Sequence, residues 1–252
     1  MKLFVVLAGA AILGFIFLRR YLEVEKGIHL SSLVMRPRNF FHHRPEIQAH
    51  EVTVEEMIPS ADTVDSKKIA KADSFVKKSD IYLGRGDAAQ AEKLLIQALS
   101  YDPSSVEAYR RLALLYLHQG LFGKAESMYR KLVVTITDEP TFLSNLAMAL
   151  FSQEKFEEAK KYYKRSIELD ADRAGRFFSL AQVLHQLNEV TEALENFKRA
   201  IQMEPDNLDY LVTLARFYID REMYPDAKEL LGEILLAFPD NEDALEMMKK
   251  IS

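Results

Sequence analysis

The 252-residue sequence contains no cysteine and no tryptophan, and it has only 9 glycines and 8 prolines. The lack of cysteine excludes disulfides, thiolate metal sites and a cysteine nucleophile. The sequence also contains no glycine-rich phosphate loop, no His-Glu metal helix and no Ser/His/Asp arrangement in a recognisable context. We therefore expect that the protein is not an enzyme, that it has no catalytic residues, and that it binds neither a cofactor nor a metal.

An excess of positive charge is also missing. The chain carries 33 lysines and arginines against 38 aspartates and glutamates, a formal net charge of −5. Residues 72–252 hold 23 of the basic and 30 of the acidic residues. Binding to a phosphate backbone needs a basic surface. Nucleic acid is therefore not an expected partner.

An alanine recurs every 34 residues over the C-terminal two-thirds of the chain. A large apolar residue stands four positions after each of these alanines, and a proline follows twelve positions after three of them. An uninterrupted period of this length is typical of a solenoid built from repeated helix pairs. The alanines are Ala91, Ala125, Ala159, Ala193 and Ala227, and the repeats they define are 72–105, 106–139, 140–173, 174–207 and 208–241.

Each position of the period has a physical role in such a pair. Large apolar residues at helical spacing predict one buried stripe per helix, and the small residues let two helices approach closely. The turn inside each pair holds Gly86, Gly120, Glu154, Asn188 or Glu222, and only the two glycines have free access to positive φ. Residues 242–252, EDALEMMKKIS, are predicted to form a shortened first helix that caps the last repeat.

Two stretches carry a resemblance to a known family. GDAAQAEKLLIQALSYDP and NEVTEALENFKRAIQMEPDN are similar to the second-helix pattern of the tetratricopeptide repeat family. The resemblance implies an all-α fold for residues 66–252, a right-handed superhelical α-solenoid of five helix-turn-helix repeats with a C-terminal capping helix. It also implies a scaffold or adaptor that binds a protein or peptide segment, with an oligomeric state that the pattern leaves open.

In this family the partner-binding groove is lined by side chains of the first helices. The pattern here favours an apolar or amphipathic segment, laid in the groove as a helix, with Phe151 and Phe178 as anchors. For Leu117, burial between neighbouring helices is an equal alternative. The residues that the resemblance assigns to the groove are Arg110, Leu114, Leu117, His118, Asn145, Met148, Phe151, Phe178, Gln182, His185, Arg216 and Ile219.

The N-terminus has a different composition. Residues 3–18, LFVVLAGAAILGFIFL, carry no charge and no polar side chain. We expect residues 1–22 to be a transmembrane anchor, although sixteen helical residues reach only about 24 Å against a hydrocarbon core of ~30 Å. A cleaved signal peptide is the alternative, but no small residues precede Arg19 and Arg20 as a cleavage site. Residues 23–65 are expected to form a juxtamembrane segment and linker.

The positions of the charges give the expected topology. Arg19, Arg20 and Lys26 follow the apolar run, against Lys2 before it, which places the repeats in the cytoplasm. This layout is similar to the bacterial inner-membrane adaptors of the same repeat family, and the resemblance implies a single-pass protein that recruits or assembles complexes at the inner membrane. The alternatives are an exported or periplasmic repeat protein in pilus or secretion assembly, and a non-catalytic subunit that supports an enzyme.

Overall fold

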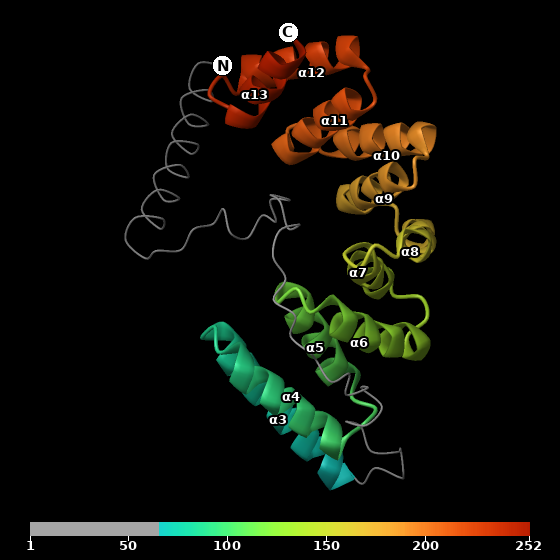
Figure 1. Ribbon diagram of the computed structural model, residues 1–252. Helices are drawn as coiled ribbons and strands as arrows, with labels where there is room; N and C mark the ends of the chain where they lie inside the picture. Colours follow the sequence, from blue (N-terminus) through green and yellow to red (C-terminus); the bar gives the residue numbers. More distant parts are fainter. Residues whose placement is uncertain (1–65) are drawn as a thin grey trace, which may run out of the picture. The chain divides into compact units, whose positions relative to one another are not determined.

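The computed structural model describes residues 66–252, which form eleven α-helices joined by short turns and contain no strand (Figure 1). The expected all-α class is confirmed for this part of the chain. The predicted span at 3–18 and the linker that follows it lie outside the described residues. Within residues 66–252, none of the helices is both long and apolar enough to cross a membrane.

The helices form five pairs and one final single helix. Each of the five predicted repeats contains one pair, except that the first helix begins at Ser66, six residues before the predicted repeat. That helix has 19 residues, whereas the first helices of the other pairs have 12 or 13. The pairs are α3 (Ser66–Gly84) with α4 (Ala88–Tyr101), α5 (Val106–His118) with α6 (Phe122–Thr135), α7 (Pro140–Phe151) with α8 (Phe156–Leu169), α9 (Ala174–Gln186) with α10 (Val190–Met203), and α11 (Leu208–Asp220) with α12 (Tyr224–Ala237), followed by α13 (Glu242–Ile251).

Contacts run mainly between helices that follow one another in the chain. The helices of each pair pack on each other, and the second helix of each pair packs on the first helix of the next. Along the stack, α5, α7 and α9 follow one another on one side, and α6, α8 and α10 on the other (Figure 1). Side chains of the first helices therefore share one side of the molecule.

The recurring alanines lie in the contacts between helices. All five are fully buried, with 0% of their surface exposed. The large residue four positions later lies one helical turn further on the same stripe, and it is also buried in every pair, as Leu95, Tyr129, Tyr163, Phe197 and Leu231. Burial of one such side chain stabilises the fold by about 1.5–3 kcal/mol. The alternation of small and large residues thus accounts for the close approach of the helices.

The turn inside each pair has the same backbone conformation in all five repeats. The second or third residue after the first helix has positive φ whether or not it is glycine: 76° at Gly86, 70° at Gly120, 62° at Glu154, 62° at Asn188 and 57° at Glu222. The next amide donates back to a carbonyl of the first helix, as from Lys155 to Leu150 at 3.0 Å. This is the hydrogen bond of a left-handed helix C-cap. The repeat imposes this conformation even where the residue is glutamate.

Candidate protein-binding face

The twelve residues assigned to the groove from the sequence lie on α5, α7, α9 and α11, the first helices of four successive pairs. Eight of them form two rows, each with one residue per helix at a spacing of 34. The 114 row consists of Leu114, Met148, Gln182 and Arg216. The 117 row consists of Leu117, Phe151, His185 and Ile219. The remaining four are Arg110 and His118 on α5, Asn145 on α7 and Phe178 on α9.

The 114 row is the more accessible of the two. Leu114 exposes 42% of its surface, and Arg216 is also exposed. Met148 and Gln182 are half-buried. The row therefore presents two neighbouring apolar side chains, then an amide, then a guanidinium. Such a sequence of groups can contact a segment that is apolar at one end and acidic or polar at the other.

The 117 row lies deeper between the helices. Leu117 is only 4% exposed, which favours the alternative that it packs inside the stack. Phe151 is half-buried, with its ring centroid 5.6 Å from that of Phe156 on α8. Ile219 is also half-buried against the core. The 117 row mainly stabilises the fold. Only parts of the Phe151, His185 and Ile219 side chains are accessible to a partner.

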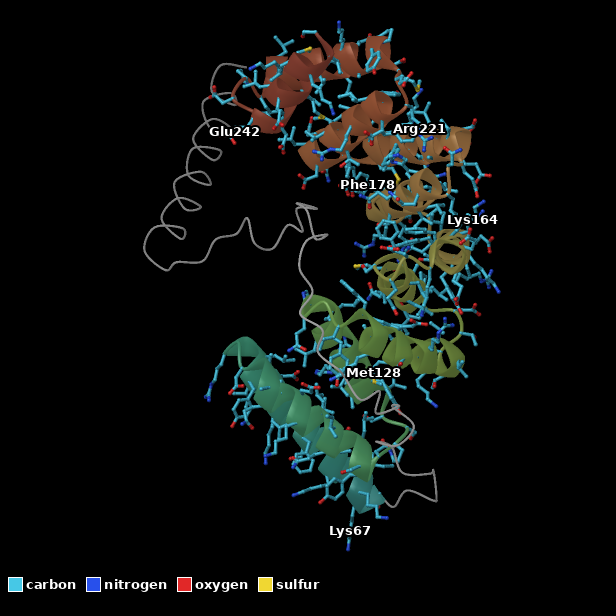
Figure 2. All side chains as sticks on the ribbon, in the orientation of Figure 1. Lys67, Met128, Lys164, Phe178, Arg221 and Glu242 are labelled. Carbon is cyan, nitrogen blue, oxygen red and sulfur yellow. The ribbon has the colours of Figure 1, made fainter. Side chains whose placement is uncertain are left out.

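Phe178, labelled in Figure 2, belongs to an aromatic cluster that joins α9, α10 and α11. Its ring stacks on Tyr210 at 4.3 Å between centroids and meets Phe197 edge-on at 5.7 Å. Phe197 lies 5.3 Å from Phe217 in turn. Aromatic pairs of this geometry contribute about 0.5–1.5 kcal/mol beyond the area they bury. Phe178 is half-buried, so only one part of its ring could serve as an anchor.

The charged residues at the α5 end are already paired. The Arg110 Nε donates to Glu107 at 2.8 Å, and Arg111 donates to both carboxylate oxygens of Asp80 on α3 at 2.5 and 2.9 Å. The hydrogen bond from Arg111 holds the pKa of Asp80 below its usual value. Sequence reasoning found Arg110 but missed this network. The 34-residue spacing could have identified Asp80, because it stands one repeat before Leu114.

Asn145 also has an intramolecular partner. Its side-chain amide donates to the Tyr129 hydroxyl on α6 at 2.9 Å. Burial is the main cause that raises the pKa of Tyr129 to about 12, so the hydroxyl stays protonated and neutral at physiological pH. Asn145 therefore fixes α7 against α6 and has fewer donors left for a ligand.

The two histidines of the predicted site differ in their surroundings. His118, at the end of α5, is exposed. The His185 side chain is 23% exposed and lies edge-on to the Phe217 ring, with centroids 5.0 Å apart. Burial, followed by the positive charge of Arg221, lowers the pKa of His185, while Asp220 opposes this shift from 3.9 Å. His185 is therefore predominantly neutral at pH 7.

Arg221 joins the last two pairs near this site (Figure 2). Its guanidinium donates to the His185 carbonyl at 3.2 Å and to the side chain of Asn188 in the turn of the preceding pair. Nowhere in residues 66–252 do three histidine, aspartate or glutamate side chains gather as a metal site would need. The face as a whole offers apolar, amide and charged groups suited to contact with another chain.

The comparisons with known proteins agree with this architecture. Two family models described as tetratricopeptide repeat match residues 76–140 and 184–251, together more than half of the chain. A third, described as anaphase-promoting complex, cyclosome, subunit 3, matches residues 118–200. No curated protein matches the chain. The chain belongs to the tetratricopeptide repeat family.

Solved structures of low sequence identity share the fold. YrrB, a repeat protein with what is described as an unusual peptide-binding site, is 21% identical, with a TM-score of 0.64 over 73% of this chain and 94% of YrrB. A tetratricopeptide repeat protein from Parabacteroides merdae is 17% identical, with a TM-score of 0.66 over 72% of each chain. PilF from Pseudomonas aeruginosa is 21% identical, with a TM-score of 0.56 over 72% of this chain and 90% of PilF.

Proposed function

We propose that the protein is a membrane-tethered scaffold that binds a protein segment along the first-helix face, the surface made by the 114 row and its neighbours on α5, α7, α9 and α11. The observation that carries the proposal is the exposure of the 114 row. Leu114 is 42% exposed on a helix whose other leucines are buried, and Met148 follows it at the repeat spacing. Solenoids use such extended surfaces for binding.

The chemistry of the face supports an amphipathic partner. Leu114 and Met148 provide an apolar middle, flanked by the paired charges of Arg110 and Arg111 on one side and by Arg216 on the other. An amphipathic helix laid across these helices would bury its apolar side on the middle and leave its charges near the ends. The proposal is supported by YrrB, which shares the fold and is described as having an unusual peptide-binding site.

A double substitution tests the binding face. Leu114→Ser with Met148→Ser should abolish capture of partner proteins by the full-length chain, because an apolar anchor contributes most when it is desolvated. The matched control is Val134→Ser with Leu236→Ser, which removes two apolar side chains that are 78% and 87% exposed on second helices. The proposal is wrong if both double variants fold, as judged by circular dichroism, and capture the same partners.

The tether is supported by the sequence of residues 3–18, which is apolar throughout and is followed by Arg19 and Arg20. We propose that this segment stays attached and that the repeats face the cytoplasm. The full-length protein should then remain in membranes washed with alkaline carbonate. A C-terminal reporter enzyme should be active only in the cytoplasm. A mature protein whose first residue lies beyond Arg20 would refute the tether.

A further inference from the structure

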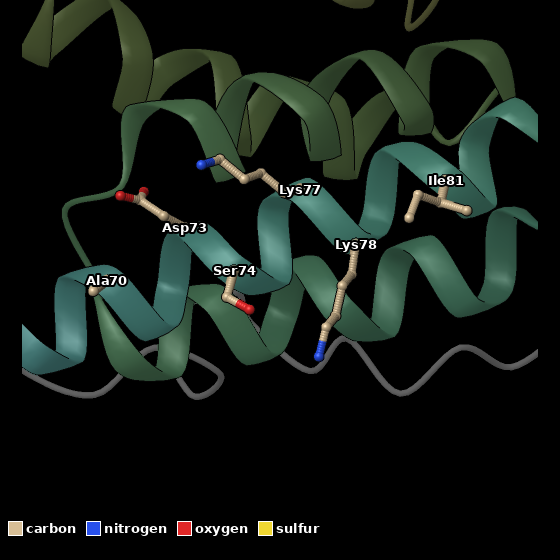
Figure 3. Close-up of a pocket in the computed structure, with 6 residues that line it drawn as sticks. All are labelled: Ala70, Asp73, Ser74, Lys77, Lys78 and Ile81. Carbon is tan, nitrogen blue, oxygen red and sulfur yellow. The ribbon is translucent and has the colours of Figure 1, made fainter.

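The first described helix, α3, differs from every later first helix in what covers it. The second helix of the preceding pair packs on each of α5, α7, α9, α11 and α13. Among residues 66–252, no helix takes this place on α3. Its uncovered face is formed by Ala70, Asp73, Ser74, Lys77, Lys78 and Ile81, which line a shallow open depression (Figure 3).

The composition of this face departs from the repeat. The residues 34 positions after Ser74, Lys78 and Ile81 are Ala108, Leu112 and Leu115, which are 0%, 2% and 7% exposed. On α3 the leucine position holds a lysine, and Ile81 is 54% exposed. A bare apolar face would favour aggregation. The lysine in place of leucine instead gives the uncovered face two cations, Lys77 and Lys78, against the single carboxylate of Asp73.

The charge of α3 contrasts with that of the rest of the described chain. α3 has five lysines and two aspartates, and Arg85 follows it directly. Residues 87–252 contain 20 basic and 28 acidic residues. Basic charge is therefore concentrated at one end of a stack that is otherwise acidic. An anionic surface would attract the α3 end and repel the remaining pairs.

Lys77 and Lys78 of this face, and the neighbouring Lys71, lack the carboxylate partners that other lysines have. Lys155, the residue before α8, lies 2.8 Å from Glu126 on α6, and Lys164 on α8 lies 2.8 Å from Glu192 of the next pair. Within the described part of the chain, Lys71, Lys77 and Lys78 have no carboxylate within ion-pair distance. Lys71 and Lys78 lie over the Phe75 ring, 5.3 and 5.9 Å from its centroid, a neutral contact that leaves their charges without a counter-ion in the described residues.

The spacing of these charges indicates the kind of anion. From Lys71 to Lys78 the helix rises about 10 Å at ~1.5 Å per residue, and Arg85 follows its last residue. A single small anion cannot reach cations spread over that length, whereas a surface of many anionic groups can. Clusters of four or more lysines and arginines on one helix are typical of helices that bind anionic lipids. Ile81 and Ala70 add apolar contact at the same face.

We propose that the uncovered basic face of α3 rests on anionic lipid headgroups and thereby holds the stack of repeats with its first pair toward the membrane. The contact does not depend on partner binding at the first-helix face. The proposed tether would bring α3 close to lipid, but the electrostatic attraction exists without it. The contact sets the orientation in which the first-helix face is presented.

The test uses the lack of cysteine in the natural chain. A Ser74→Cys variant of the full-length protein is labelled with an environment-sensitive fluorophore. It is mixed either with vesicles of phosphatidylcholine alone or with vesicles that also contain ~30 mol% of the anionic lipid phosphatidylglycerol. The emission should shift to the blue only with the anionic vesicles. The shift should vanish in high salt, because the interaction is screened.

A matched pair of variants assigns the effect to this face. Each lysine near an anionic surface raises the partition coefficient roughly fivefold, so Lys77→Gln with Lys78→Gln should lower partitioning into the anionic vesicles about 25-fold. Lys249→Gln with Lys250→Gln, an adjacent exposed pair on α13, should leave it unchanged. An equal shift with neutral vesicles, or an unchanged shift in the α3 variant, would overturn the proposal.

Two further outcomes separate this proposal from others. The labelled protein is also measured without lipid. If its emission is already shifted to the blue and high salt removes the shift, an acidic protein segment occupies the α3 face, and the lipid proposal is wrong. Vesicle flotation separates the two proposals. Loss of the protein from neutral vesicles after a carbonate wash would refute the tether, and its flotation with anionic vesicles at low salt would support the α3 contact. The two proposals can therefore fail separately.

Discussion

Glutamate at two of the five left-handed turns leads to a prediction that runs against the usual effect of glycine. Glu154 and Glu222 have φ of 62° and 57°. For a residue with a side chain, this conformation costs about 1–2 kcal/mol because Cβ crowds the following carbonyl. Glycine avoids that cost, but its unfolded chain is more flexible, which offsets about 0.5–1 kcal/mol. We expect Glu154→Gly and Glu222→Gly each to stabilise the fold by about 0.5–1 kcal/mol.

The equivalent turns supply controls with opposite signs. Gly86 has open space where a Cβ would stand, and at Gly120 the nearest atoms are those of the Phe122 ring at 3.9 Å. Gly86→Ala and Gly120→Ala should therefore destabilise through conformation alone, by ~1 kcal/mol. Asn188→Gly should gain less than the glutamate variants, because asparagine tolerates this region and its side chain accepts from Arg221.

The assay is urea denaturation of the full-length protein followed by circular dichroism, with hydrogen exchange of the helices that flank each turn. Hydrogen exchange is needed because a solenoid can unfold one pair at a time. The reference variant is Glu195→Gly in the middle of α10, an exposed helical site where glycine should cost about 1 kcal/mol. The reasoning fails if Glu154→Gly and Glu222→Gly lose as much stability as Glu195→Gly.

Two other substitutions test the packing and the electrostatics. Ala159→Trp should destabilise by ~1–3 kcal/mol in the same denaturation assay, because Ala159 is fully buried in the contact of α7 with α8; an unchanged midpoint would show that the repeat register is wrong. The lowered pKa of His185 means that the unfolded chain binds a proton more readily, so stability should fall as pH drops below about 6.5 and His185→Gln should weaken this fall. The matched control is His118→Gln, a change at an exposed site. If the stability of His185→Gln depends on pH in the same way as that of the parent protein, His185 does not cause the fall.

The helix pairs could be predicted from the sequence because the same residue types recur in each pair at a spacing of 34 residues. The period fixes Ala91 and its four equivalents in helix contacts, and all five are buried as expected. It did not predict that α3 begins at Ser66, since those additional residues have no equivalent in the other pairs. Nor does residue type reveal positive φ at Glu154, where the surrounding repeat determines the backbone.

The candidate face was harder to read from the sequence. The period places Leu114 and Leu117 on the same side of α5, yet one is 42% exposed and the other 4%. Leu117 belongs to the core cluster between the helices and Leu114 does not, a difference in packing that a linear pattern does not contain. The stacking of Phe178 on Tyr210 likewise joins two different pairs. The repeat predicted which helices form the face, and only the packing shows how much of each side chain is accessible.

The succession of contacts along the stack has a consequence for how a partner would act on the protein. Because each helix packs mainly on those next to it in the chain, contacts link residues that are close in sequence, and distant pairs sense each other only through the pairs between them. A segment lying across α5, α7, α9 and α11 would connect pairs that are not neighbours in the stack, such as the α5–α6 and α11–α12 pairs. A bound partner would then link the distant pairs of residues 66–252 directly. The four pairs it contacts should unfold together, and at a higher denaturant concentration.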